Sequence, residues 1–112
     1  LTTEELKQYD GSDPEKPIYL AIKGKVYDVT EGRSYYGPGG SYAFFSGRDA
    51  ARGYITGCFQ KHLTHDLRGL TEDQIKSLSS WSDFYEKSDK YFYVGEVVHE
   101  PIDPNSPLPE DC

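Results

Sequence analysis

The sequence predicts a single domain of the α+β class, in which short helices accompany a small sheet. In residues 17–30, large apolar side chains recur at every second position before a tight Lys23-Gly24 turn, and Val26 and Val29 follow it, which predicts a β-hairpin. Two capping boxes, which begin at Thr2 and Thr71, predict the starts of two helices. The length of 112 residues suits one core of modest size and not two.

The chain is expected to open with a short helix and the hairpin. Thr2 can cap a helix that ends near Tyr9, and Glu5 completes its capping box. In the hairpin that follows, Ile18, Leu20 and Ile22 recur at every second position, as one buried face of a strand requires.

Three helical segments and one strand are expected after the hairpin. Ser41 is expected to cap a helical turn over residues 42–45, and Asp49 to begin a helix over residues 50–55. Thr71 begins the longest helix, in which large apolar side chains recur at spacings of three and four. These side chains are Ile75, Leu78, Trp81, Phe84 and Tyr85. A strand over residues 91–98 completes the sheet.

The last part of the chain differs in composition from the rest. Residues 99–112 contain four prolines and no apolar periodicity, so the domain is expected to span residues 1–98 and to be followed by a tail. The two cysteines are Cys58 and the final residue, Cys112. One interpretation is a disulfide that ties the tail to the domain, which indicates an oxidising compartment such as the endoplasmic reticulum lumen or the exterior. The other is a pair of thiols in a reducing compartment.

Charge and motifs exclude several classes of function. The formal net charge of −7 disfavours binding to nucleic acid and to anionic lipid. No apolar run is long enough to cross a bilayer, so membrane attachment would need an anchor absent from this chain. A Gly-x-Ser-x-Gly nucleophile motif and a phosphate-binding loop are both missing, which argues against an enzyme. His62 and His65 lack further metal ligands at a suitable spacing and are expected to be solvated.

Glycines and aromatic residues are concentrated between Gly32 and Gly47. This composition fits either a loop folded against a flat ligand or a surface loop anchored by its aromatic side chains, and by itself it favours the second. The phenol of Tyr42 offers a chemical role for the first, because a phenolate is a hard anionic ligand for ferric haem iron. A free tyrosine has a pKa of about 10, so the phenolate would need help from the metal and from neighbouring donors.

The sequence resembles the membrane-associated progesterone receptor family over residues 1–98. The resemblance rests on motifs in matching order: residues 22–30, Gly32-Arg33, Tyr36-Gly37-Pro38, Tyr42, residues 45–50, Lys90-Tyr91 and Val94-Gly95. Residues 42–49 and 84–87 are most similar to the neuferricin branch. The resemblance implies a cytochrome b5-like haem/steroid-binding fold, with a small mixed sheet and short helices that form a haem pocket. The His-Pro-Gly-Gly motif of cytochrome b5 is absent, which argues against bis-histidine electron transfer.

The resemblance also implies a site. The family's axial ligand to the iron of haem b is a tyrosine, and Tyr42 matches it. Five further residues are expected at the pocket: Tyr36, Phe45, Asp49, Lys90 and Tyr91. Gly39 and Ser41 stand where the family often has Glu and Pro, which is a departure in the loop that carries the ligand.

The function expected from this resemblance is binding of five-coordinate ferric haem by a protein that is not an enzyme. By analogy the protein would be a haem carrier or sensor, or a regulator of haem monooxygenases. An exposed haem face could stack against that of a second molecule and form a homodimer. Two alternatives remain: a module for a steroid or other apolar ligand, and a protein-interaction module that has lost the cofactor.

Overall fold

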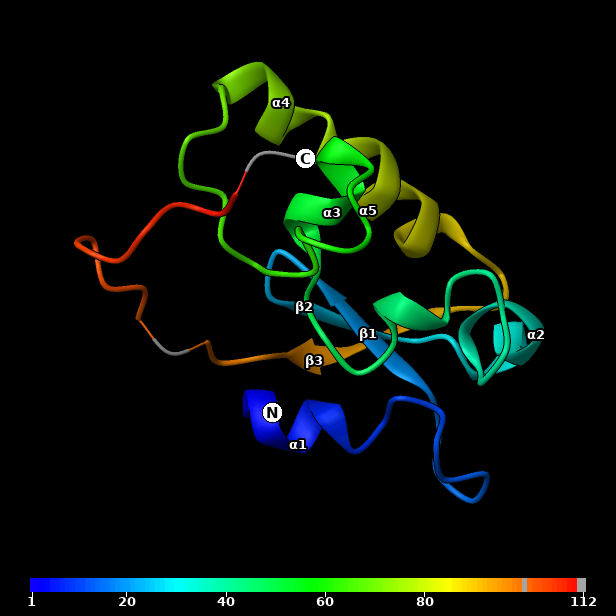
Figure 1. Ribbon diagram of the computed structural model, residues 1–112. Coiled ribbons are helices and arrows are strands. Elements are labelled where there is room, and N and C mark those ends of the chain that lie inside the picture. Colours follow the sequence, from blue (N-terminus) through cyan, green and yellow to red (C-terminus); the bar gives the residue numbers. More distant parts are fainter. Residues whose placement is uncertain (100, 111–112) are drawn as a thin grey trace.

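A three-stranded antiparallel sheet forms the centre of the molecule in a computed structural model that describes residues 1–99 and 101–110. The strands lie in the order β1 (Tyr19–Ile22), β2 (Lys25–Asp28) and β3 (Phe92–Glu96). Helices α3 (Ala51–Thr56), α4 (Glu72–Lys76) and α5 (Leu78–Lys87) lie on one side of the sheet, and α1 (Thr3–Lys7) lies on the other (Figure 1). The α+β class predicted from the sequence is confirmed.

The hairpin and the first helix form as the sequence predicts. Lys23 and Gly24 both have positive φ, at 50° and 84°, which is the conformation of a two-residue hairpin turn. Thr2 accepts a hydrogen bond from the backbone of Glu5, and the Glu5 side chain accepts one from the backbone of Thr2. Strand β3 is shorter than the predicted strand over residues 91–98.

All pairing between the named strands is antiparallel. Parallel pairing is confined, in the part of the chain that is described, to isolated bridges between Thr2 and Val98 and between Ala21 and Asp49. The mixed character expected from the family resemblance is therefore limited to these bridges.

The long helix predicted after Thr71 is divided in two. Its capping box is present, because Thr71 accepts from the backbone of Gln74 and the Gln74 side chain accepts from the backbone of Thr71. At Ser77 the chain leaves α4 and begins α5. The Ser77 hydroxyl donates a hydrogen bond to the carbonyl of Gln74, and such a bond bends a helix.

The segment between the hairpin and α3 contains more short helix than the sequence indicates. It includes η1 (Thr30–Gly32), α2 (Arg33–Tyr36) and η2 (Ala43–Phe45). The prediction that Ser41 caps residues 42–45 is wrong, because Tyr42 holds the N-cap position of η2 and no side chain caps it. Asp49 lies one residue before the N-cap of α3, yet its carboxylate still accepts a hydrogen bond from the backbone of Ala51.

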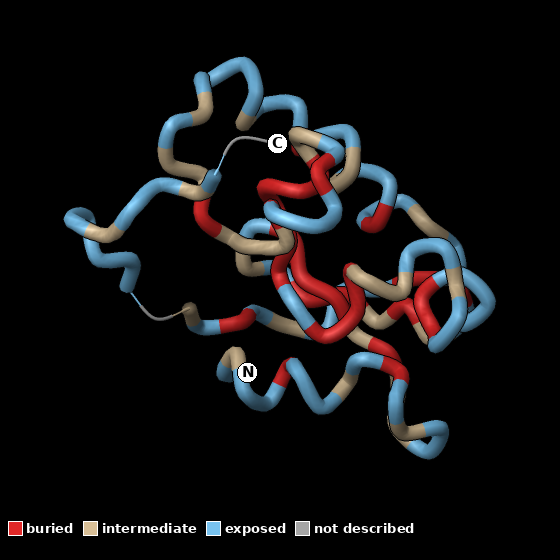
Figure 2. Tube along the Cα trace, in the orientation of Figure 1, coloured by how far each residue is buried: buried red, intermediate tan, exposed pale blue. Residues whose placement is uncertain are grey.

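Most of the core lies between the sheet and the helices above it, where Figure 2 shows the buried segments gathered. Successive residues of a strand point to opposite faces of the sheet, so the strands contribute to two separate hydrophobic clusters. The larger contains Leu20, Ile22 and Tyr27, which pack with aromatic residues from α2, η2, α3 and α5. The smaller contains Ala21 and Val26, which face Leu6 of α1 and Val97.

The C-terminal segment returns to the body of the domain. The guanidinium of Arg68 donates hydrogen bonds to the carbonyls of Asp103, Ser106 and Pro107 and to the Ser106 hydroxyl. Glu110 pairs with Lys61 at 3.5 Å. The expected disulfide between Cys58 and Cys112 remains a prediction, because Cys112 lies outside the described residues.

Candidate functional site

Tyr42 lies at the centre of a group of aromatic side chains. Its backbone amide donates to the carbonyl of Tyr35 at 2.8 Å, which holds the loop of Gly37 to Ser41 closed against α2. Its ring is 6.0 Å from that of Tyr36 and stacks on Phe45 at 6.1 Å, measured between centroids. Its side chain is 39% exposed, and its hydroxyl makes no hydrogen bond to any described residue. This phenol oxygen is therefore accessible to a ligand from solvent.

Tyr36 and Phe45 contact Tyr42 directly, and Tyr91 joins the group through Tyr36. The ring of Tyr91, one residue before β3, meets that of Tyr36 edge-on at 5.8 Å. A Cβ atom at Gly32 would lie 2.3 Å from the Tyr91 hydroxyl oxygen, so only glycine allows Tyr91 to pack there. Burial is the main cause that raises the pKa of Tyr91, and the nearby phenol of Tyr35 adds to it. Near neutral pH, Tyr91 is therefore a protonated phenol, which can donate a hydrogen bond.

Lys90 is exposed and immediately precedes Tyr91. Its backbone amide, like that of Tyr91, donates to the Ser88 hydroxyl, which fixes the start of β3. Its side chain makes no ion pair within residues 1–99 and 101–110. The structure thus places Lys90 next in the chain to the aromatic group, with its ammonium available to a charged ligand.

Asp49, in contrast, faces away from the aromatic group. Its Oδ2 atom accepts hydrogen bonds from the Gly24 amide at 2.7 Å and from His99 Nε2 at 2.8 Å. Its Oδ1 atom accepts from the Ala51 amide. These contacts show what Asp49 does in this structure: it joins the hairpin turn, the start of α3 and the chain after β3.

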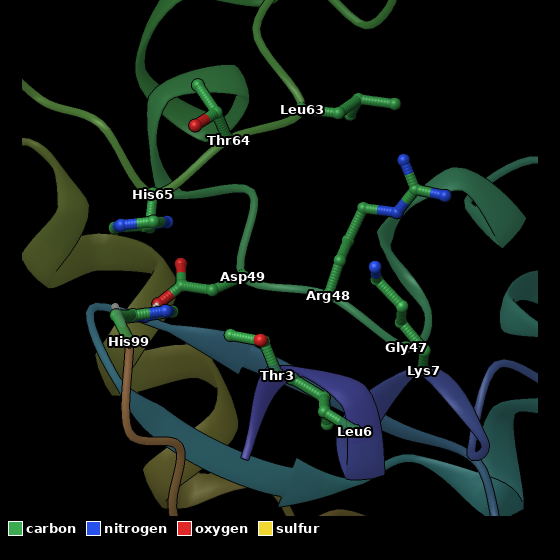
Figure 3. Close-up of a pocket in the computed structure, with 10 residues that line it drawn as sticks. All are labelled: Thr3, Leu6, Lys7, Gly47, Arg48, Asp49, Leu63, Thr64, His65 and His99. Carbon is green, nitrogen blue, oxygen red and sulfur yellow. Dashed lines mark hydrogen bonds and ion pairs between the residues drawn. The ribbon is translucent and has the colours of Figure 1, made fainter. Parts of the chain in front are cut away.

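A second cluster surrounds Asp49 and borders a cavity of about 160 Å³. The rings of His65 and His99 stack in parallel with centroids 3.9 Å apart, and His99 bonds Asp49. Figure 3 shows Lys7 and Arg48 on the opposite side of this cavity. Burial and the nearby His99 lower the pKa of His65. Asp49 was singled out from the sequence, but its grouping with His65 and His99 was not predicted, because these residues come from segments far apart in the chain.

The expectation that His62 and His65 are solvated is wrong for His62 and holds only in part for His65, which is partly exposed. His62 is 3% exposed, and its ring bonds the Thr56 hydroxyl and the Glu110 carbonyl. The His65 Nε2 atom is buried without a hydrogen-bond partner among the described residues. The sequence around these histidines is polar and does not predict burial. His62 is buried because its ring contacts Thr56 of α3 and Glu110 of the returning C-terminal segment.

Three tyrosine hydroxyls meet in the core behind Tyr42. The hydroxyls of Tyr36 and Tyr85 are 2.9 Å apart, and those of Tyr85 and Tyr54 are 3.0 Å apart. Desolvation is the main cause that raises the pKa of all three phenols above the ordinary value. Tyr36 therefore connects the exposed aromatic group with a buried polar row. The sequence analysis placed Tyr36 at the pocket and Tyr85 on the apolar face of the long helix, but it did not predict the hydrogen bond between them.

These residues fit haem better than a bare metal ion. No group of three or more histidine, cysteine, aspartate or glutamate side chains is arranged to hold a metal within residues 1–99 and 101–110. An iron atom bound at Tyr42 would have one protein ligand and would need a macrocycle for its other bonds. The flat rings around Tyr42, and the half-exposed Phe84 packed at 6.1 Å from Tyr91, offer an apolar surface for such a macrocycle.

The described residues contain no helix long and apolar enough to span a bilayer.

Comparisons with known proteins agree on one kind of domain. The family model described as "Cytochrome b5-like Heme/Steroid binding domain" matches residues 2–98. Membrane steroid-binding protein 1 of Arabidopsis thaliana is 50% identical over 98 residues, and neuferricin of Danio rerio is 46% identical over 99 residues. These matches cover 87% and 88% of the chain, but only 44% and 36% of the two relatives. The chain thus spans less than half of the length of either relative.

A solved structure supports the same comparison. A hypothetical Arabidopsis thaliana protein, described as having a cytochrome b5-like fold, superposes with a TM-score of 0.76. It is 46% identical in sequence, and the match covers 88% of this chain and 89% of that protein.

Proposed function

Because this chain belongs to the cytochrome b5-like haem/steroid-binding domain family, we propose that it binds ferric haem b through the phenolate oxygen of Tyr42. The family supports binding of haem or steroid in general. The observation that favours haem and this ligand is the accessible Tyr42 hydroxyl, which no described residue engages, at the centre of an aromatic surface. Haem supplies a ferric iron that acts as a Lewis acid toward this oxygen.

The surroundings of Tyr42 favour an anionic ligand atom. Tyr36 and Tyr91 remain protonated at neutral pH, because burial raises the pKa of both. Each can therefore donate a hydrogen bond toward an oxygen that has lost its proton. Lys90 is placed to pair with a propionate, since its ammonium has no ion-pair partner in the described part of the chain.

We further propose that the iron is five-coordinate. The three histidines are engaged elsewhere: His62 bonds Thr56, and His65 and His99 stack beside Asp49. They are therefore poor candidates for a second axial ligand. A sixth position open to solvent would leave one haem face exposed, and two such faces could stack in a homodimer. Sedimentation velocity with and without haem tests the dimer, and equal masses would contradict it.

A role as haem carrier, haem sensor or regulator of haem monooxygenases follows from the proposed binding and from family analogy. One of the relatives is named as a steroid-binding protein, and its name also carries the word membrane. We propose residence in the secretory pathway, in the endoplasmic reticulum lumen or outside the cell. Attachment to a membrane would require a segment other than the residues of this chain.

Steroid binding is the second candidate function. The family description and the name of Membrane steroid-binding protein 1 both mention steroid. The same aromatic surface could cover a flat apolar ligand without a bond to the Tyr42 oxygen. The lining residues would be Tyr36, Phe44 and Phe45, which contact Tyr42, together with Phe84, which contacts Tyr85 and Tyr91. A protein-interaction module without a cofactor is the third candidate, and it predicts saturable binding of neither compound.

The test is a titration of the intact chain with ferric haem, and separately with progesterone. We expect tight, saturable haem binding that Tyr42→Phe weakens by at least the roughly 10- to 100-fold that loss of an outer-shell partner of a metal ligand costs, because the variant removes the ligand atom itself. Tyr35→Phe is the matched control, because Tyr35 is also exposed and lies 6.3 Å from the Tyr42 ring. Equal haem affinity in Tyr42→Phe and Tyr35→Phe would contradict the proposed ligand. Saturable progesterone binding without haem binding would favour the second function.

A further inference from the structure

The row of three buried phenols has one more proton than its internal hydrogen bonds can use. Tyr36, Tyr85 and Tyr54 are joined by two hydrogen bonds, between hydroxyls 2.9 Å and 3.0 Å apart. Each phenol carries one proton, and burial keeps all three protonated because it raises the pKa of each. Three protons and two bonds leave one O–H group unused: that of Tyr36, that of Tyr54 or, where Tyr85 accepts from both neighbours, that of Tyr85.

The two ends of the row have different surroundings. Tyr54 stacks on Phe45 with centroids 4.0 Å apart and lies 4.9 Å from Trp81, so its hydroxyl end is packed among apolar rings. No acceptor other than Tyr85 is available to the Tyr54 hydroxyl among the described residues. The Tyr36 end instead adjoins the rings of Tyr42 and Tyr91. An unused donor is costly when buried among apolar groups, and useful where an anionic oxygen forms.

We propose that Tyr85 is a positioning residue for the iron ligand: it accepts a hydrogen bond from Tyr54 and donates to Tyr36, which directs the Tyr36 proton toward Tyr42. This inference rests on the proposed function, because only a phenolate at Tyr42 supplies the acceptor. No bond to carbon or iron changes in this step. Each hydroxyl keeps its own proton and only the direction of donation is fixed.

Ligand binding and the direction of the row are then coupled. Without an anionic oxygen at Tyr42, the row can run the other way, with Tyr36 donating to Tyr85 and Tyr85 to Tyr54. When the Tyr42 phenolate forms, the rotation of three hydroxyl groups reverses the row. Each donor in the reversed row strengthens the next, because a phenol that accepts a hydrogen bond becomes a better donor.

The test compares ferric haem complexes of single Tyr→Phe variants in the intact chain. The readouts are the energy of the phenolate-to-iron charge-transfer band and the rate of haem dissociation to a scavenger protein. A hydrogen bond stabilises a phenolate, so its weakening shifts the band to lower energy. We expect Tyr85→Phe to shift the band in this direction and to accelerate dissociation roughly 3- to 10-fold through loss of cooperative donation. Tyr54→Phe should give a smaller change of the same sign.

Tyr27→Phe is the matched control. Tyr27 is fully buried and stacks on Tyr85 at 5.4 Å, but its hydroxyl is outside the row. The substitution removes one hydrogen bond, from the Tyr27 hydroxyl to Glu86. If Tyr85→Phe folds poorly, Tyr54→Phe carries the comparison. A band that is lost in Tyr42→Phe but has the same energy in Tyr85→Phe, Tyr54→Phe and Tyr27→Phe would overturn the positioning role alone. A wild-type complex without the band would overturn the proposed function instead.

Discussion

Tyr91 packs directly over Gly32, with its hydroxyl oxygen only 2.3 Å from the position that a Cβ atom on this glycine would occupy. Gly32→Ala must therefore displace the Tyr91 ring, which packs on Tyr36 beside Tyr42. We expect the variant to lose about 1–3 kcal/mol of folding free energy through overpacking. We also expect weaker haem binding, measured by titration beside urea denaturation.

A double-mutant cycle gives the control for this contact. Tyr91→Phe removes the atom that meets the new methyl group first. Gly32→Ala should therefore cost less stability in the Tyr91→Phe background than in the wild type. Additive losses would show that the two residues do not compete for this space.

Alkaline pH should destabilise the fold through the buried phenol row. The pKa values of Tyr36, Tyr54 and Tyr85 are raised in the folded state, so folding favours their protonated forms. Stability from this source is complete below the unfolded pKa of about 10 and is lost as the pH rises above it. Each phenol should contribute a slope of about 1.4 kcal/mol per pH unit.

Urea denaturation of the haem-free chain between pH 8 and pH 11 measures this slope. Exposed lysines and tyrosines contribute equally in the wild type and in Tyr85→Phe, so the difference between the two isolates one buried phenol. The variant should show the shallower decline with pH. Identical slopes would mean that Tyr85 ionises as easily in the folded chain as in the unfolded one.

Arg68 should hold the C-terminal segment without taking part in ligand binding. Its guanidinium pairs with Asp66 at 2.8 Å and donates to backbone or side-chain oxygens of Asp103, Ser106 and Pro107. We expect Arg68→Ala to speed proteolysis within residues 101–110 several-fold and to leave haem affinity unchanged. Proteolysis at the wild-type rate would show that these contacts do not restrain the segment.

The disulfide between Cys58 and Cys112 remains a prediction. The contacts of Glu110 are compatible with it. The Glu110 carbonyl is bonded by the His62 ring, and the His62 amide donates to the carbonyl of Cys58. The segment that ends at Cys112 thus passes close to the turn that begins at Cys58. Intact mass measurement without reductant should find the chain lighter by two hydrogen atoms. A mass that corresponds to two thiols would contradict the disulfide.

Local signals in the sequence were sufficient for the elements that frame the site. The capping boxes at Thr2 and Thr71 and the Lys23-Gly24 turn are formed by residues adjacent in the chain, and all three are confirmed. The division of the long helix at Ser77 was not predicted, because apolar periodicity continues across it while a single side-chain hydrogen bond bends it. Family resemblance, rather than periodicity, drew attention to Tyr42.

Contacts between distant segments could not be predicted in the same way. The bond between Asp49 and His99 joins residues 50 positions apart, and the phenol row joins residues from α2, α3 and α5. The neighbouring sequence does not show whether a polar residue is solvated or makes such a contact. His62, which lies in a polar segment and is buried, is an example. Asp49 remains a predicted supporting residue of the pocket, and its bonds to the hairpin turn and to His99 were not predicted.

Resonance Raman spectroscopy of the ferric haem complex tests the bond between iron and Tyr42 most directly. The chain is produced with isotopically labelled tyrosine, so that vibrations of a coordinated phenolate are identified by their frequency shift. We predict iron–phenolate vibrations that shift with the label in the wild type and in Tyr35→Phe and are absent in Tyr42→Phe. Vibrations that persist in Tyr42→Phe, or a wild-type spectrum with axial histidine and no phenolate mode, would contradict the bond.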